Sequence, residues 1–196
     1  AWLLENGIRA DVHVIIDARP ENIAFLSSPD PKCHYFIASQ CHPSLFDALK
    51  GCKVTVVHLL ADGMLEFLTG FNTDKPTHLI GGGTTVGMKA ILIAHETGAR
   101  KIHLYGMDSS YSDGEHHAYA QEMNSGERLL DAVCGDRKFC CAPWMITQAT
   151  DFIALAEYII RDGSIITVNG EGLLPHVARE FMATPTIIPA DIRANE

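Results

Sequence analysis

The sequence predicts an α/β fold of the Rossmann-like type, a three-layer sandwich with a mostly parallel sheet that could lack its N-terminal strand. The first observation is that short apolar runs alternate with segments able to form helices. The second is that glycines such as Gly51, Gly98 and Gly163 follow those segments and can end helices. The third is the absence of repeats, linkers and low-complexity stretches, so we expect one domain over 1–196.

The elements follow in order along the chain. Pro20 can occupy the first turn of a helix, and a strongly apolar stripe at helical spacing begins at Trp144. Residues 106–126 have little apolar periodicity and predict a long loop, which in a compact domain is usually functional or mobile. We expect strands over 12–16, 34–38, 53–60, 77–80, 101–105, 138–142 and 164–168, helices over 20–26, 42–51, 84–97, 144–163 and 173–181, and a weak helix or loop over 63–70.

Composition excludes several classes of function. The chain has 196 residues, 47% of them hydrophobic and 20% charged, as in an ordinary globular protein. No apolar run approaches the roughly 18 residues of a transmembrane helix, and a net charge of -9 argues against broad nucleic-acid binding. The six cysteines show no CxxC spacing, which disfavours zinc and predicts reduced thiols and a cytoplasmic location.

Three consecutive glycines, Gly81, Gly82 and Gly83, separate a short apolar strand from a helix that Thr84 or Thr85 can cap. Unpaired N–H groups and the helix dipole make such a turn an anion site. Neither standard nucleotide motif fits, because Met88 stands where the GxxxxGK[ST] pattern needs lysine and the GxGxxG pattern is one residue out of register. Phosphate binding and close helix–strand packing are therefore both open.

Polar side chains follow several of the predicted strands, where ligands of open parallel sheets gather. They are Asp17, Gln40, Asp108 and Asn169. Asp17 and Asp108 could hold Mg²⁺ or a ribose hydroxyl; the alternative for each is a carboxylate that caps a helix.

The segment 115–124 is rich in hydrogen-bonding groups. His117 could act as general acid or base, and Tyr119, Gln121 and Asn124 could hold a sugar or a base. The alternative is a solvated helix start.

The stretches "GGGTTVGMKAILIAHETGARKIHLYGMDSSY", "HHAYAQ", "APWMITQATDF" and "NGEGLLPHVA" resemble the 6-hydroxymethylpterin diphosphokinase-like family. The same family supplies a domain of the motility accessory factors, putative flagellin glycosyltransferases, and its layout is similar to that of bacterial sialyltransferases. The resemblance implies a Rossmann-like fold that binds a nucleotide or nucleotide-sugar. By position it implies a phosphate turn at Gly81–Thr84, strand-end acids at Asp17 and Asp108, and a loop pair at His117 and Tyr119 near the transferred group.

Two departures from the family pattern direct the functional prediction. The chain starts after the strand and Gly-Pro-Ser loop with which family members usually begin, so we expect an N-terminally truncated domain and a sheet that a partner chain could complete in a homo-oligomer. "IIDARPEN" holds one Asp where the archaeal pterin enzymes tend to carry Asp-x-Asp.

These departures favour a glycosyltransferase-like enzyme that uses a nucleotide-sugar. The first alternative is a 6-hydroxymethyl-dihydropterin diphosphokinase that uses ATP and Mg²⁺. A non-catalytic nucleotide-binding module is a further alternative. A nicotinamide-dependent oxidoreductase is disfavoured, because GxGxxG is absent.

Overall fold

A computed structural model describes residues 3, 6–60, 79–112 and 126–183. Within these residues, strands and helices alternate as the sequence predicts. The strands are β1 (Val12–Ile15), β2 (His34–Ala38), β3 (Lys53–Leu59), β4 (Leu79–Ile80), β5 (Lys101–Leu104), β6 (Leu130–Cys134), β7 (Arg137–Cys141) and β8 (Ile165–Val168). The helices are the 3₁₀ helix η1 (Pro20–Leu26) and the α-helices α2 (Pro43–Ala48), α4 (Val86–Glu96), α5 (Pro143–Arg161) and α6 (Leu173–Ala183).

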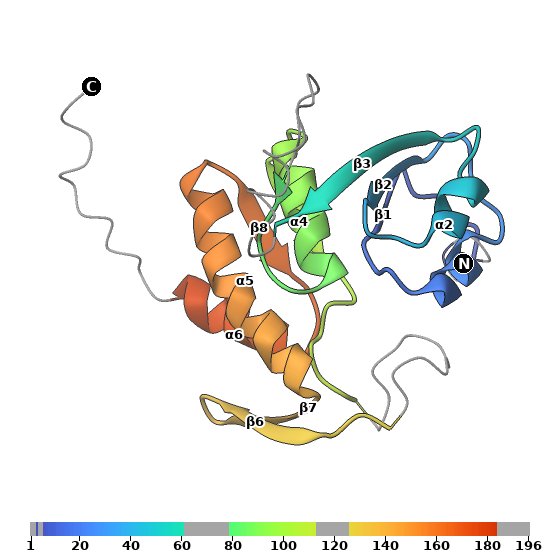
Figure 1. Cartoon of the computed structure of the whole chain (residues 1–196). Coiled ribbons are helices and arrows are strands. Elements are labelled where there is room, and N and C mark those ends of the chain that lie inside the picture. The colour runs from blue at the N-terminus through green and yellow to red at the C-terminus, as the bar shows by residue number, and fades with distance from the viewer. Residues whose placement is uncertain (1–2, 4–5, 61–78, 113–125, 184–196) are drawn as a thin grey trace.

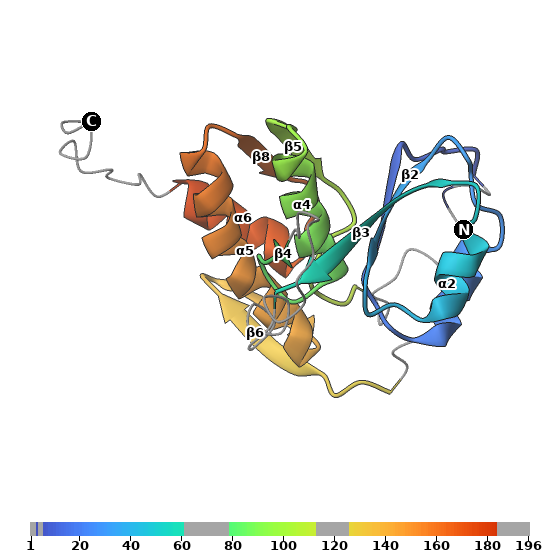
Figure 2. The ribbon, with the colours of Figure 1, turned by 45° about the horizontal axis from the view of Figure 1, so that its top comes forward.

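The predicted α/β fold with a mostly parallel sheet is confirmed. Strands β1, β2, β3 and β4 form a parallel sheet in that order, and β5 pairs in parallel with β8. Strand β3 extends from the neighbourhood of β1 and β2 towards α4 (Figures 1 and 2). Because the strands run parallel, the turns that follow them lie at their carboxyl ends, where ligands of such sheets bind.

Helices cover both faces of β2. Side chains alternate between the two faces of a strand, and Phe36 faces α4 together with Val57 of β3. Tyr35 and Ile37 therefore face the opposite side, where the core also contains Leu45 of α2. The almost continuous burial of β2 explains its uninterrupted apolar sequence.

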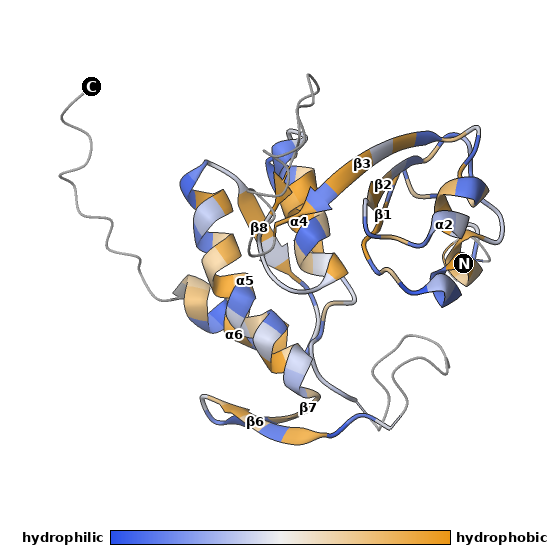
Figure 3. Ribbon diagram, viewed as in Figure 1, coloured by the Kyte–Doolittle hydropathy of each residue, from blue (hydrophilic) through white to orange (hydrophobic). Residues whose placement is uncertain are grey.

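Helix α4 contributes to two hydrophobic clusters. Ile93 packs in the cluster of the four-stranded sheet, whereas Met88 and Ile91 pack in the cluster built from β5, β7, β8, α5 and α6. Hydrophobic residues predominate along the helix (Figure 3), which stands between β3 and α5. One helix thus contributes to both clusters, and the single domain over 1–196 stays a prediction.

The hairpin of β6 and β7 differs from the expectation. We predicted a strand over 138–142 but none over Leu130–Cys134, and the two strands pair antiparallel. The two-residue connection, Gly135 and Asp136, is a typical hairpin signal. Side chains alternate along β7, so Cys141 is fully buried and Cys140 is exposed. Burial raises the pKa of the Cys141 thiol to about 11.

Candidate functional site

The predicted phosphate turn opens α4 at the carboxyl end of β4. Gly82 and Gly83 both adopt left-handed backbone conformations, with φ of 73° and 89°, which glycine adopts at little cost. Thr85 is the N-cap of the helix, and its hydroxyl oxygen accepts from the Met88 N–H at 3.4 Å. Thr84 is exposed, and the glycines are half-buried, so the turn is open to solvent.

The first N–H groups of α4 have no acceptor among the described residues. They are the backbone N–H groups of Val86 and Gly87, and their lack of a partner within this part of the chain is usual for the start of a helix without further capping. The first turn also contains no acidic residue. The N-terminus of α4 therefore presents free donors and the positive end of the helix dipole.

The glycines of the turn also serve packing. A Cβ at Gly82 would lie 3.2 Å from side-chain carbons of Leu92 and Leu155, and one at Gly83 would lie 2.9 Å from the Cβ of Met88. The alternative of a turn required for close packing is thus compatible with the geometry, and the glycines alone do not decide between the two functions.

Lys89 supplies a positive charge at this turn, a role that sequence analysis missed. Its side chain is only 6% exposed, and Nζ donates to the carbonyl oxygens of Gly81 at 2.7 Å and Ile80 at 3.4 Å. Helical side chains lean towards the N-terminus, which carries the ammonium back to the end of β4. Burial lowers the pKa of Lys89, while the nearby Asp151 carboxylate opposes that shift.

A second buried donor lies beside the first turn of α4. Gln148 of α5 is 6% exposed, and its Oε1 accepts from the Ser109 hydroxyl at 3.2 Å. Its Nε2 lies 3.5 Å from the point where a Cβ at Gly87 would stand, and that donor has no acceptor among the described residues. Ser109 has a left-handed φ of 53°, uncommon outside glycine. Sequence analysis placed this position within the helix predicted over 144–163 and gave it no role.

Asp151 brings a carboxylate to the same turn. Its Oδ2 accepts from the Thr84 hydroxyl at 3.2 Å. Carboxylate oxygens and phosphate oxygens together are ligands that Mg²⁺ prefers. Asp151 therefore fits a metal ion held mainly by a phosphate group. Sequence analysis missed this residue because α5 is far from the turn in sequence and meets it only in the folded chain.

Asp108, a predicted catalytic and metal residue, caps helix α6. Its Oδ1 accepts from the Gly172 N–H at 3.2 Å, its backbone oxygen accepts from the Leu174 N–H at 3.0 Å, and the Ser110 hydroxyl accepts from the Leu173 N–H at 3.3 Å. The Asn169 side chain donates to the Leu104 carbonyl at 3.1 Å. Both predicted site residues thus have structural partners, and their roles in catalysis and ligand binding stay predictions.

Asp17 lies after the edge strand β1 and has a cation of its own. It accepts from the Arg19 backbone N–H at 2.9 Å and from the Arg19 Nε at 2.8 Å, and the Arg19 side chain lowers the pKa of Asp17. The Gln40 amide donates to the Ile16 carbonyl at 3.1 Å. These contacts give Asp17 a local ion pair, whereas η1 has no side-chain cap, and a joint Mg²⁺ site of Asp17 and Asp108 stays a prediction.

The predicted loop pair of His117 and Tyr119 lies outside the described residues, as do Gln121 and Asn124. Their roles stay predictions. Among the residues that the structure describes, no group of three or more His, Cys, Asp or Glu side chains could hold a metal.

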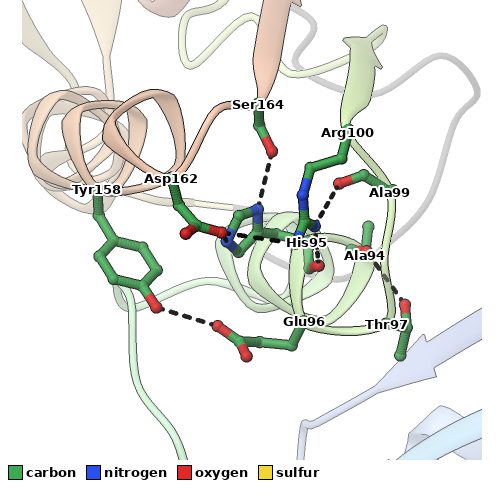
Figure 4. Close-up of polar contacts among 9 residues, drawn as sticks. All are labelled: Ala94, His95, Glu96, Thr97, Ala99, Arg100, Tyr158, Asp162 and Ser164. Carbon is green, nitrogen blue, oxygen red and sulfur yellow. Dashed lines mark hydrogen bonds and ion pairs between the residues drawn. The ribbon is translucent and has the colours of Figure 1, made fainter.

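A separate polar cluster connects the C-terminal ends of α4 and α5 (Figure 4). It lies at the amino ends of β5 and β8, away from the glycine turn. The buried His95 ring contacts the Ser164 hydroxyl at 2.9 Å and the Asp162 carboxylate at 3.1 Å. This order of groups is similar to a Ser-His-Asp triad, but Ser164 is only 4% exposed and cannot meet a substrate. The cluster is a structural link between the ends of the two helices.

Comparison with known proteins gives one family. The family model for 6-hydroxymethylpterin diphosphokinase MptE-like proteins matches residues 1–114, which include the glycine turn and Lys89. No curated protein and no solved structure gives a significant match. Of the helices that the structure describes, none is both long and apolar enough to cross a bilayer. Because the match spans more than half of the 196 residues, the chain belongs to the 6-hydroxymethylpterin diphosphokinase MptE-like family.

Proposed function

We propose that the chain transfers diphosphate from ATP to the hydroxymethyl group of a pterin and releases AMP. The family is that of a pterin diphosphokinase-like transferase. This match favours our first alternative over the glycosyltransferase-like enzyme that the departures from the family pattern suggested.

The observation that carries the proposal is the open start of α4. Free N–H groups of Val86 and Gly87, the ammonium of Lys89 and the spare donor of Gln148 lie around one turn. These groups are all donors, and a bound polyphosphate has only acceptors to offer them. Of these groups, the Gln148 Nε2 is buried and has no acceptor among the described residues, and an unpaired buried donor costs free energy that a bound phosphate oxygen would recover.

The reaction would be a displacement at the β-phosphorus. The hydroxyl oxygen of the acceptor bonds to the β-phosphorus, the bond from that phosphorus to the oxygen bridging the α-phosphate breaks, and AMP leaves with that oxygen. The hydroxyl proton passes to a base, for which His117 stays our proposal. The donors of the turn stabilise negative charge on the transferred group, which is the main protein contribution in phosphoryl transfer.

Mg²⁺ accompanies ATP in such reactions and offsets phosphate charge. Among the described residues at the turn, the Asp151 carboxylate would bind the Mg²⁺ ion, and the Thr84 hydroxyl oxygen lies beside it as a further possible ligand. Asp17 and Asp108 have other partners.

The test is AMP formation from ATP, Mg²⁺ and 6-hydroxymethylpterin, followed by chromatography. We expect AMP and the pterin diphosphate in equal amounts, and no AMP when the pterin is left out. Gly82→Val should abolish the reaction, whereas Gly98→Val, which imposes a similar left-handed strain (φ of 104°) in open space at the other end of α4, should retain it.

No AMP from the correctly folded chain would refute the diphosphokinase. Release of a nucleoside diphosphate from a nucleotide-sugar instead would reinstate the glycosyltransferase, and nucleotide binding with neither product would indicate a binding module.

A further inference from the structure

A groove with a volume of about 1030 Å³ runs along α4, between that helix and strands β2 and β3. One end is formed by Gly82, Gly83 and Asp151, at the proposed phosphate turn. The other end lies at Glu96 and Tyr158, near the last turn of α4. A helix rises about 1.5 Å per residue, so the groove leads from the turn along most of the length of α4.

The chemistry of the groove is unsuited to an anion. Two carboxylates, Glu96 and Asp151, line it, and neither lysine nor arginine is among its described lining residues. Of the titratable rings that line it, His34 contacts the Thr55 hydroxyl at 2.8 Å, and burial lowers the pKa of His34, which favours its neutral form. This described lining favours a ligand rich in hydrogen-bond donors over a phosphate, except at the turn itself, where Asp151 can act through a bound cation.

The walls of the groove suit a flat ring. The rings of His34 and Phe36 lie 4.5 Å apart with a tilt of 32°, and they form an aromatic strip on the sheet side. Apolar side chains of Leu92 and Leu155 lie on the helix side. An apolar cleft with a few well-placed polar groups is the usual form of a small-molecule site.

Glu96 is positioned to bind such a ring by its edge. The Tyr158 hydroxyl donates to Oε1 of Glu96 at 3.2 Å (Figure 4) and so orients the carboxylate. A carboxylate has about four acceptor sites, so this bond leaves capacity for the adjacent N–H groups of an aminopyrimidinone ring.

We propose that this groove binds the ring of the acceptor alcohol, with its donor edge at Glu96 and its hydroxymethyl arm directed to the turn at Gly82 and Gly83. The inference rests on the proposed function, and it adds where the acceptor lies and which residues select it. The site takes a neutral, two-ring, donor-rich heteroaromatic compound and excludes the phosphates of the donor.

The test uses the intrinsic fluorescence of 6-hydroxymethylpterin in titrations of the purified chain. Glu96→Gln removes the carboxylate from an exposed position and should weaken pterin binding at least tenfold. Glu157→Gln is the matched control, because Glu157 is also exposed but lies outside the groove, and it should bind as the unaltered chain does.

A second pair of variants tests the volume of the groove. Ala154 is an exposed lining residue, so Ala154→Trp should block the groove without disturbing the core, whereas Glu157→Trp should not. We expect Ala154→Trp to raise the KM for the pterin at least tenfold and to leave the Kd for ADP within twofold.

The outcomes separate this inference from the proposed function. AMP formation with an unchanged pterin KM in both Glu96→Gln and Ala154→Trp would overturn the groove assignment alone. Absence of AMP formation in the unaltered chain would overturn the function, and with it the inference. A stable dimer that Ala154→Trp dissociates would show that a second copy fills the groove, which also overturns the assignment.

Discussion

Two helices begin after glycine turns in this fold, and their starts are treated in opposite ways. At α6, the side chains of Asp108 and Ser110 and the Asp108 carbonyl accept the N–H groups of Gly172, Leu173 and Leu174. At α4, the Thr85 hydroxyl is the side-chain cap among the described residues, and the N–H groups of Val86 and Gly87 have no acceptor there. A glycine turn before a helix therefore does not by itself identify a ligand site, because the same kind of turn precedes both a capped start and a less fully capped one.

The largest expected difference between the two helix starts is the loss of stability when a glycine is replaced by alanine. A Cβ at Gly172 would collide with the Asp108 backbone oxygen and lie 2.6 Å from the Ser110 Oγ, so Gly172→Ala should lower the free energy of unfolding by about 3 kcal/mol. A Cβ at Gly82 meets only the ends of flexible leucines, so Gly82→Ala should cost about 1 kcal/mol from its left-handed backbone. Urea denaturation measures both, and equal losses would contradict the distinction.

Removal of the buried cation should affect the open start alone. Lys89→Met keeps the volume of the side chain and deletes the ammonium, so ADP binding should weaken about thirtyfold, equivalent to about 2 kcal/mol. Lys101→Met, at the exposed first residue of β5, is the control. Calorimetric titration decides, and an unchanged Kd in Lys89→Met would show that the ammonium serves only the carbonyls of β4.

Mutation of the capped start of α6 should change the free energy of unfolding. Asp108→Ala removes the capping carboxylate and should lower the free energy of unfolding by about 1.5 kcal/mol, measured by thermal or urea unfolding. Asp108→Asn retains an acceptor oxygen and should lose less. If Asp108→Asn is stable but forms no AMP, the catalytic role that we predicted for Asp108 is restored.

The smallest of the predicted effects at the start of α4 is a change of ADP affinity with pH. The pKa of Lys89 lies below its usual value of 10.5 because of burial, and phosphate binding needs the charged form. ADP affinity should therefore fall as the pH rises from 7 towards 10, before an ordinary lysine would lose its proton. Lys89→Arg stays charged and should show a flat profile over the same range.

The same shift has the opposite effect on folding. The unfolded chain holds the Lys89 proton more tightly than the folded one, so this residue makes stability rise with pH between the folded and unfolded pKa values. A pH-independent difference between the unaltered chain and Lys89→Met would contradict the shift.

Sequence analysis predicted the elements well where one physical signal dominated. Strand β2 is buried on both faces, so its apolar run has the same bounds as the prediction. Strand β6 was not predicted, because exposed residues such as Asp131 alternate in it with residues that are only half-buried. The two-residue turn that follows it was not taken into account.

The site was predicted less well, because its chemistry depends on contacts between distant segments. The glycine turn was visible as a local pattern. A lysine within an otherwise apolar helix was a signal for Lys89, since burial of charge requires partners. Gln148 and Asp151 had no comparable signal, because only the packing of α5 against α4 brings them to the turn.

Exposed and buried side chains alternate along β7, so the two adjacent cysteines of this strand can be used to follow local unfolding of the hairpin. Cys140 is exposed to reagents, whereas its neighbour Cys141 is enclosed and holds its proton to about pH 11. Alkylating agents attack the thiolate, so in the native protein Cys140 should be modified first and Cys141 only when the strand opens. Peptide mass spectrometry of this single pair would thus time local opening near α6 without any introduced label.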